Sequence, residues 1–417
     1  MILTREEESM VQGKHGPGIQ RCMNILIKFG EAFGAEKLVR ISSAHVFNFL
    51  PPDLLEELSE GVGRCENFTT IHPYMSLCDP GAFEELGLSH AHFEARQADQ
   101  EIRDKIYDRL GFFRNYTCAA LLVGNFVKKG DFVSWFGSSV QVFINSVIGA
   151  KQNRDGAVIN MAAAITGRAP QWGLFLDENR HAELLVEMGD LDTSSLSRTD
   201  YAAIGYYVGG IAQERNTAIA GLKQDLSLEE IRYLLTPIST SGSVSLCHLV
   251  GITPESPTLE AAFGGRAPQE RILVGRKEIR ETKERFSPTD PCPVDLVIFG
   301  CPHCTIQEIK KIASLLEGRK VGTSQRLWIG TAGQISDFAR ECGFAQPIEK
   351  AGGVFARACM ATIPDCPIPQ DVRVVATNSF KTAHYVSAIS KGRIRTIVGE
   401  TEQCIEAAIQ GKWRGES

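Results

Sequence analysis

The sequence predicts an α/β protein with mostly parallel sheets, and three observations carry this prediction. Apolar runs of strand length alternate with longer amphipathic stretches along almost the whole chain. In the last third, the order is strand, helix, strand, helix, which favours helical crossovers between parallel strands. At 417 residues, the chain is also long enough for two or three domains with cores of their own.

The individual elements follow from these patterns. Near the amino end, an apolar run at 38–46 precedes helical spacing at 51–62, and a second strand pattern follows at 68–74. In parallel sheets, ligands collect beyond the carboxyl ends of the strands, so residues directly after a strand are the first candidates for function. Later in the chain, the same alternation gives a strand at 294–300, a helix at 305–318, a strand at 326–331 and a helix around 334–343.

We expect one catalytic region over residues 1–290, which has room for two intertwined α/β units, and a carboxyl-terminal α/β unit over 291–417. The boundary lies in the Pro-rich polar stretch ERFSPTDPCPVD. Neither the GxGxxG dinucleotide fingerprint nor the GxxxxGK[ST] phosphate loop occurs.

Composition and charge exclude several classes of protein. The chain is 43% hydrophobic and 23% charged, and its formal net charge of -6 offers no positive field to nucleic acid. The amino end has no signal-peptide pattern, and no apolar run approaches the roughly 20 residues of a membrane-spanning helix. We therefore expect a cytoplasmic protein with neither a nucleic-acid nor a membrane partner. In that compartment, the 12 cysteines favour buried thiols over a disulfide framework.

The segment Gly300-Cys301-Pro-His-Cys304 is the sharpest local motif. A buried strand ends at Gly300, and a helix starts just after the cysteines, where Thr305 and Glu308 can form a capping box. A thiolate near a helix amino terminus is stabilised by the helix dipole. Three interpretations stay open from this segment: a redox dithiol as in thioredoxin-like proteins, a metal site such as zinc, or a buried structural pair.

Two further cysteines and one lysine stand out. Cys118 and Cys366 each lie in a turn context, Cys366 between prolines, and widely separated turn cysteines are what a three-cysteine iron–sulfur site uses. In TNSFK, Asn378 or Ser379 can cap a helix. Lys381 falls just inside the same helix, where its charge opposes the dipole, and an anionic ligand would resolve this conflict.

Taken together, the sequence resembles the large-subunit, or catalytic, part of the aconitase X family. The resemblance covers nearly the whole chain and involves many ordered segments. These are LTREEESMVQGKHG at 3–16, YTC at 116–118, INSVIGAKQNRDG at 144–156, AAAITGRAPQWGL at 162–174, HLVGITPE at 248–255, FGCPHC at 299–304, TNSFKTAHY at 377–385 and CIEAAIQGKW at 404–413.

The resemblance implies an aconitase-like fold of α/β/α units around an iron–sulfur cluster, [4Fe-4S] or [2Fe-2S], and a hydro-lyase reaction. By position, the cluster ligands of the family fall on Cys118, Cys301 and Cys366, whereas Cys304 lies outside the set. Three protein ligands leave one iron open as a Lewis acid. The resemblance also implies that the catalytic base is a serine on a separate small swivel-domain subunit of about 130 residues, so the catalytic residue of this chain is unknown.

Characterised members of the family dehydrate cis-3-hydroxy-L-proline or 5-phosphomevalonate. Of their substrate-contacting positions, the lysine falls on Lys381 and is retained, while an Asn-Pro pair becomes His72-Pro73 and a Glu-Ser pair becomes Gly137-Ser138. A substrate-contacting Gly-Val-Ser turn of the family falls near residue 48, where this sequence has Asn48-Phe49-Leu50. The resemblance therefore implies a dehydratase of a small hydroxy-carboxylate with a changed pocket. Within the family, the alternatives are cis-3-hydroxy-L-proline dehydration first and 5-phosphomevalonate dehydration second. A non-catalytic cluster-binding protein and a thiol-disulfide oxidoreductase are the alternatives from other classes.

Overall fold

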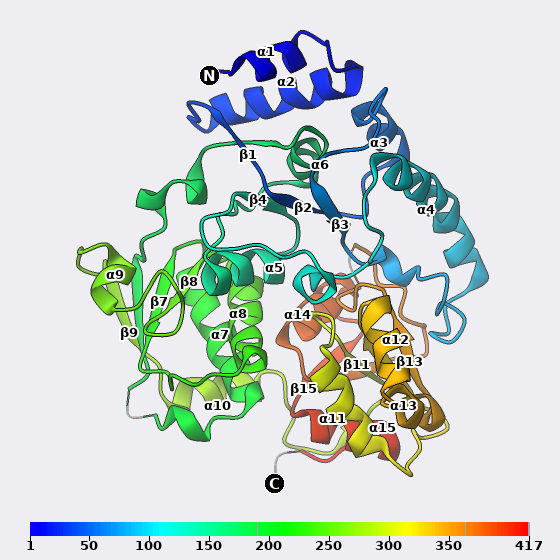
Figure 1. Cartoon of the computed structure of the whole chain (residues 1–417). Helices are drawn as coiled ribbons and strands as arrows, with labels where there is room; N and C mark the ends of the chain where they lie inside the picture. Colours follow the sequence, from blue (N-terminus) through cyan, green and yellow to red (C-terminus); the bar gives the residue numbers. More distant parts are fainter. Residues whose placement is uncertain (190, 363, 416–417) are drawn as a thin grey trace.

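The computed structural model describes residues 1–189, 191–362 and 364–415 and arranges them as three α/β units (Figure 1). In the figure, the first unit is blue to cyan at the top, the second is green, and the third is yellow to red. All described strand pairs in the three main sheets are parallel, which confirms the predicted fold class. Among the described residues, no helix has the length and apolar character to cross a membrane.

The first unit is built on a three-stranded parallel sheet of order β3-β2-β4. In its register, Ala44 lies between Thr69 and Ser134. The strands are β2 (Ser43–Val46), β3 (Phe68–Ile71) and β4 (Val133–Trp135), and β1 (Leu38–Arg40) pairs antiparallel with β5 (Arg168–Pro170). The helices are α1 (Arg5–Val11), α2 (Pro17–Ala32), α3 (Pro52–Leu58), α4 (His90–Leu110), α5 (Ser138–Phe143) and α6 (Ala157–Thr166).

The second unit has a four-stranded parallel sheet of order β8-β7-β6-β9. Its two long helices, α7 and α8, approach each other through glycines. A Cβ atom at Gly205 would lie 2.0 Å from the carbonyl oxygen of Leu234, so this contact requires glycine. The elements are β6 (Leu184–Glu187), β7 (Thr217–Ala220), β8 (Cys247–Leu249), β9 (Glu270–Leu273), α7 (Arg198–Ala212), α8 (Leu228–Gly242), α9 (Leu259–Phe263) and α10 (Arg276–Glu284).

The third unit has a five-stranded parallel sheet of order β13-β12-β11-β14-β15. Its strands are β11 (Leu296–Phe299), β12 (Arg326–Gly330), β13 (Gly353–Ala356), β14 (Val374–Thr377) and β15 (Arg395–Val398). Its helices are α11 (Ile306–Leu316), α12 (Gly333–Glu341), α13 (Ala345–Ala351), α14 (Phe380–Ile389) and α15 (Thr401–Gln410), and β10 (Cys292–Pro293) pairs with β16 (Lys412–Trp413).

Shared hydrophobic cores fix the units against one another. One core joins Met23 and Leu55 of the first unit to Ile298 and Trp328 of the third. Another core contains most apolar residues of the second unit together with Phe380 of α14. Because burial of apolar surface stabilises these contacts, a site built between the units has rigid walls.

All three sheets are wound in the same way. In each, the first strand lies inside the sheet, the next strands extend to one side, and the chain then crosses to the other side of the first strand. The loops after the first strand and after the returning strand diverge, which opens a crevice at the carboxyl end of the sheet. In the first unit this crevice lies after β2 and β4, and in the third unit it lies after β11 and β14.

Candidate active site

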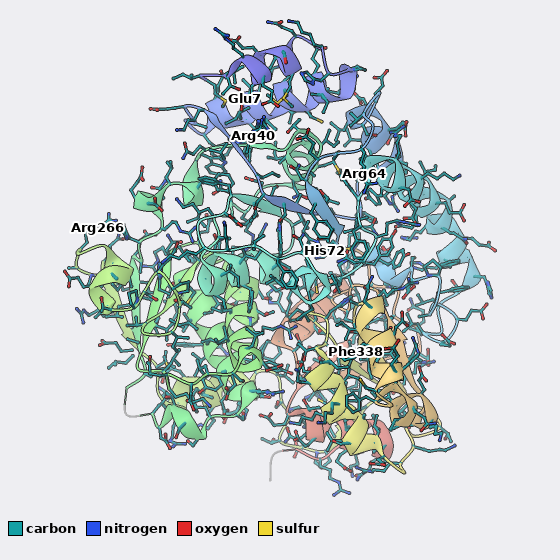
Figure 2. All side chains as sticks on the ribbon, viewed as in Figure 1. Glu7, Arg40, Arg64, His72, Arg266 and Phe338 are labelled. Carbon is teal, nitrogen blue, oxygen red and sulfur yellow. The ribbon has the colours of Figure 1, made fainter. Side chains whose placement is uncertain are left out.

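The crevices of the first and third sheets open into one cavity of about 1000 Å³. The first unit contributes residues that directly follow its strands, namely Phe47 after β2, His72 after β3 and Phe136 after β4, and Gly137 comes next. The third unit contributes Cys301 after β11 and Lys381 at the start of α14. His72 lies near the middle of the molecule (Figure 2). Residues that follow parallel strands therefore meet here, as the sequence predicts.

Three cysteines line this cavity, namely Cys118, Cys301 and Cys359. We call it the cysteine cavity. The structure thus brings two of the predicted ligands, Cys118 and Cys301, to one place. Cys366 is not among the residues that line the cavity, and its Sγ lies 4.0 Å from a guanidinium nitrogen of Arg393. Cys359, which sequence reasoning did not single out, takes a place at the cavity instead.

Backbone hydrogen bonds explain why Cys118 and Cys359 arrive there. The segment before Cys118 runs beside β3, where the amide of Thr117 donates to the carbonyl oxygen of Ile71 at 3.1 Å. The amide of Cys359 donates to the carbonyl oxygen of Tyr74 at 2.8 Å. Both cysteines are therefore held near the carboxyl end of β3. Cys359 follows β13 by three residues, so it too lies beyond the carboxyl end of a parallel strand, but that strand is not among those predicted from the sequence.

His303 ties the three cysteine segments together. Its Nε2 lies 3.0 Å from the carbonyl oxygen of Ala358, which only accepts, so Nε2 carries the proton. Nδ1 then accepts from the Thr117 hydroxyl at 2.9 Å, and the backbone amide of His303 donates to Sγ of Cys118 at 3.2 Å. Burial lowers the pKa of His303 to about 4, so the ring is neutral. Apart from the CxxC spacing, no local pattern indicates this role.

The packing of the two side chains argues against a redox dithiol formed by Cys301 and Cys304. The Cys301 side chain belongs to the core shared by the first and third units, whereas the Cys304 side chain packs on the other face among Val297 and Ile309. Burial raises the pKa of Cys304 well above the usual thiol value. Among the residues that the structure describes, no group of His, Cys, Asp or Glu has the geometry for a single metal ion.

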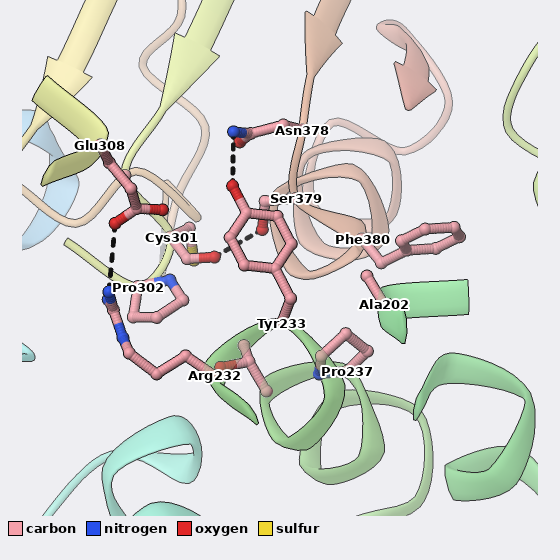
Figure 3. A pocket seen from close by; sticks show the side chains of 12 residues that line it. Ala202, Arg232, Tyr233, Pro237, Cys301, Pro302, Glu308, Asn378, Ser379 and Phe380 are labelled. Carbon is pink, nitrogen blue, oxygen red and sulfur yellow. Dashed lines mark hydrogen bonds and ion pairs between the residues drawn. The ribbon is translucent and has the colours of Figure 1, made fainter. Parts of the chain in front are cut away.

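Behind Cys301, a second-unit helix closes the site (Figure 3). Arg232 of α8 forms an ion pair with Glu308 at 3.1 Å and also donates to the carbonyl oxygen of His303 at 2.8 Å. Ser379 donates to the carbonyl oxygen of Cys301 at 2.5 Å and caps α14. The predicted capping box of Thr305 and Glu308 is present at α11. The turn that carries Cys301 is thus bound from both α8 and α14.

Lys381 reaches across the cavity to the first unit. Its Nζ donates to the hydroxyl of Ser138 at 2.8 Å and lies 3.4 Å from that of Ser139. Its side chain is only 9% exposed, and both of these hydroxyl groups are neutral. Because a buried ammonium without a counter-ion is costly, this position favours an anionic ligand. Ser138 and Lys381, both predicted as substrate-binding residues, line the cavity, and so does Pro73.

His72 occupies space that Gly137 leaves. A Cβ atom at Gly137 would lie 3.0 Å from Nε2 of His72, and Gly137 has φ +111°, a region that favours glycine. Nδ1 of His72 has no hydrogen-bond partner among the described residues. Burial, followed by the charges of nearby groups including Lys381, holds the pKa of His72 well below its usual value, so the ring is neutral.

Arg154 and Asp155 also line the cavity, and sequence reasoning missed both. They belong to the segment INSVIGAKQNRDG and precede α6, but nothing local in the sequence indicates that Asp155 is buried. Oδ1 of Asp155 has no partner among the described residues, and burial raises the pKa of this carboxyl to about 7. Asn48 and Phe49 lie outside the cysteine cavity and line a neighbouring one.

Known proteins resemble this chain over nearly its whole length. Residues 1–178, 182–284 and 294–410 match the family models of the aconitase X first, second and third domains. The phosphomevalonate dehydratase large subunit of Methanothermobacter thermautotrophicus is 34% identical over 395 residues, which are 93% of this chain and 94% of the relative. That of Methanocaldococcus jannaschii is 32% identical over 418 residues, covering 97% of this chain and 100% of the relative.

A cis-3-hydroxy-L-proline dehydratase from Pseudomonas aeruginosa is 29% identical over 413 residues, which are 97% of this chain and 70% of the relative. A crystal structure of aconitase X from Thermococcus kodakaraensis, described as the holo-form, aligns with a TM-score of 0.83 at 29% identity and covers 98% of this chain and all of that one. The dehydratases among these relatives are hydro-lyases. The chain therefore belongs to the aconitase X family.

Proposed function

We propose that this chain is the large subunit of an iron–sulfur hydro-lyase that removes water from a small hydroxy-carboxylate. The observation that carries the proposal is the meeting of three cysteines with Lys381 and Ser138 in one cavity. The named activities of the relatives, all dehydratases, support the reaction class.

The cysteines fit a cluster better than a single ion. Ligands of one tetrahedral ion crowd around a single point, whereas ligands of a cubane bind different irons and stand farther apart. Three cysteines in one cavity, together with no single-ion site among the described residues, agree with the second arrangement. An iron–sulfur cluster held by three thiolates keeps one iron open and so supplies Lewis-acid chemistry. We assign the ligands as Cys118, Cys301 and Cys359, with Cys359 in place of Cys366.

The other cavity residues bind substrate and handle protons. Lys381 and Arg154 provide positive charge for a carboxylate, and Ser138 keeps the Lys381 ammonium oriented by accepting its hydrogen bond. Dehydration breaks one C–H and one C–O bond, so one proton leaves carbon and the departing hydroxide takes up a proton to become water. Asp155, with a pKa near neutrality, is suited to hold the proton that hydroxide receives.

The base that takes the proton from carbon is assigned to a small partner subunit. A second cavity of about 580 Å³, mainly apolar, adjoins the first at Cys118 and is lined by residues such as Leu121 and Leu228. Phe126, which follows Leu121 by five residues, is 79% exposed. An exposed apolar surface beside a reaction cavity is typical of a protein–protein contact. The names of several relatives contain the words large subunit, which imply a small subunit. We assign this small subunit to the exposed apolar surface.

The test is turnover by the chain, loaded with iron and sulfide and mixed with a candidate small subunit. We expect dehydration of at least one hydroxy-carboxylate in a panel that includes 5-phosphomevalonate and cis-3-hydroxy-L-proline, and no turnover by the large chain alone. Phe126→Asp should weaken complex formation at least tenfold, while Phe338→Asp, at an exposed site on α12, should not. A complex that retains its cluster and dehydrates no hydroxy acid would favour the non-catalytic alternative.

A further inference from the structure

A separate cavity of about 880 Å³ lies beside the cysteine cavity. One wall is α4, which presents Arg96, Gln100 and Arg103 on one face because they are spaced by four and three residues. Met75 lines both cavities, and the consecutive residues Phe47 and Asn48 line one each. The two spaces are therefore neighbours, separated by a few side chains.

Arg103 is buried in this wall, and no described carboxylate forms an ion pair with it. It is 6% exposed, and within the described part of the chain its guanidinium donates to the carbonyl oxygen of Leu50 at 3.3 Å and to Oε1 of Gln100 at 3.4 Å. Its Nε has no partner among the described residues. A guanidinium has five N–H donors and stays charged. Buried charges are normally paired, because an unpaired one loses its hydration without compensation.

The nearby carboxylates do not supply the missing charge. Asp104 is already engaged by Arg114 at 2.7 Å and by the hydroxyl of Tyr116. Arg96 forms its ion pair with Asp365, and Asp99, which also lines the cavity, is exposed to solvent. The cavity thus has a buried cationic donor group. Beside it, the amide nitrogen of Gln100 already donates to Oδ1 of Asn48 and to Oδ1 of Asp104, so the unpartnered donor that the described residues leave at this wall is Nε of Arg103. A guanidinium is suited to bind a carboxylate or phosphate group.

We propose that the cavity lined by Arg103 is an oxyanion-binding site. The ligand is a carboxylate or phosphate group, either as the far end of the substrate or as a separate small anion. The first source rests on the proposed function, because it makes the substrate a molecule with two anionic ends that spans the cavities on either side of Met75. The binding site itself does not depend on that function.

Inorganic phosphate is the probe for direct binding. At constant ionic strength, phosphate should raise the thermal midpoint of the purified cluster-loaded chain by roughly 2–5 °C and saturate. Arg103→Met should weaken this dependence about 10- to 100-fold, since a charge-assisted hydrogen bond is lost. Arg109→Met is the matched control, because Arg109 lies on the same helix and pairs with Glu56 outside the cavity. Equal phosphate dependence in wild type and Arg103→Met would overturn the proposal.

A second pair of variants covers the case in which Arg103→Met does not fold. Ala95 is an exposed position on α4 that lines the cavity, so Ala95→Glu adds a second carboxylate to that of Asp99 without disturbing a core. Ala98→Glu makes the same change at an exposed position that does not line the cavity. We expect Ala95→Glu to weaken the saturable phosphate effect at least tenfold and Ala98→Glu to preserve it. The reverse result would overturn the proposal.

A series of phosphonocarboxylates with two to four methylene groups distinguishes the two sources. If the site holds the far end of the substrate, one member should bind at least tenfold more tightly than phosphate, because a single molecule then occupies both cavities. If the site holds a separate anion, every member should bind like phosphate. In both cases, Arg103→Met should weaken binding. Failure of the hydro-lyase assay with intact phosphate binding would reject the proposed function alone.

Discussion

The second and third units have the same sheet winding, yet only the third opens onto the cysteine cavity. At the carboxyl end of the third sheet, the chain places Cys301, Cys359 and Lys381. At the corresponding end of the second sheet lie Met188 and Val274, both buried and apolar. The winding therefore creates a crevice in each unit, and the residue types after the strands decide whether it is filled or becomes a site.

The first unit gives a further contrast. Its strand ends also face the cysteine cavity, and they bring rings and hydroxyls such as His72 and Ser138. Cys118 of the first unit lines the cavity as well, together with Cys301 and Cys359 of the third. We infer a division of labour in which these three cysteines hold the cluster and the residues after the first-unit strands select the substrate. Changes at the cysteines should then abolish iron binding, and changes at His72 or Ser138 should leave iron in place.

The largest effect is expected from Cys359→Ser compared with Cys366→Ser. If Cys359 is a ligand, its replacement should remove most of the bound iron and the visible absorbance of the cluster, and with them all turnover. Cys366→Ser should keep both, because Cys366 does not line the cavity. The iron and sulfide contents of the two variants, measured after identical reconstitution, show which cysteine binds the cluster. Loss of iron in Cys366→Ser with retention in Cys359→Ser would restore the assignment made from the sequence.

This contrast also marks what the sequence can predict. Alternating patterns predicted the fold class, because parallel sheets need helical crossovers. The position after a strand pointed to Cys301, which the structure places in the cavity. The choice between Cys359 and Cys366 depends on the hydrogen bond from Cys359 to Tyr74, a contact between distant segments. His303 and Asp155 were missed for the same reason, since burial and long-range partners leave no local pattern.

A smaller effect is expected from Lys381→Met, which tests whether the positive charge of the third unit serves the substrate or the cluster. Loss of a charge-assisted hydrogen bond should lower kcat/KM by about 10- to 100-fold with iron content unchanged. Lys391→Met, at an exposed position just after α14, is the control. Loss of iron in the Lys381 variant would assign the lysine to cluster binding instead.

Asp155 gives a pH-dependent prediction for the first unit. Its pKa is raised from 3.8 to about 7 by burial, so the folded chain binds this proton more tightly than the unfolded chain does. The free energy of unfolding should therefore fall as pH rises from about 4 to 7, by on the order of 3–4 kcal/mol relative to Asp155→Asn. Urea unfolding of both proteins across this range measures the difference. A constant difference would mean that the carboxyl titrates normally.

The same group should shape the activity. If protonated Asp155 supplies the proton for the departing hydroxide, kcat should decline above pH 7 in the wild type. Asp155→Asn should be slow and lack this decline. An unchanged pH profile in the variant, with normal iron content, would remove Asp155 from proton transfer.

The smallest effect concerns His72 and Gly137, which share one space in the first unit. Gly137→Ala would place a Cβ 3.0 Å from Nε2 of His72 at a backbone angle of φ +111°, and the strain should cost about 1–2 kcal/mol of stability. His72→Asn shortens the side chain and should partly relieve the contact. The double variant should then be more stable than additivity predicts, by about 0.5–1 kcal/mol. If the first unit selects the substrate, His72→Asn should also change kcat/KM unequally across a panel of hydroxy acids and leave iron content unchanged. A uniform change across the panel, or loss of iron, would contradict the division between the cysteines that hold the cluster and the first-unit residues that select the substrate.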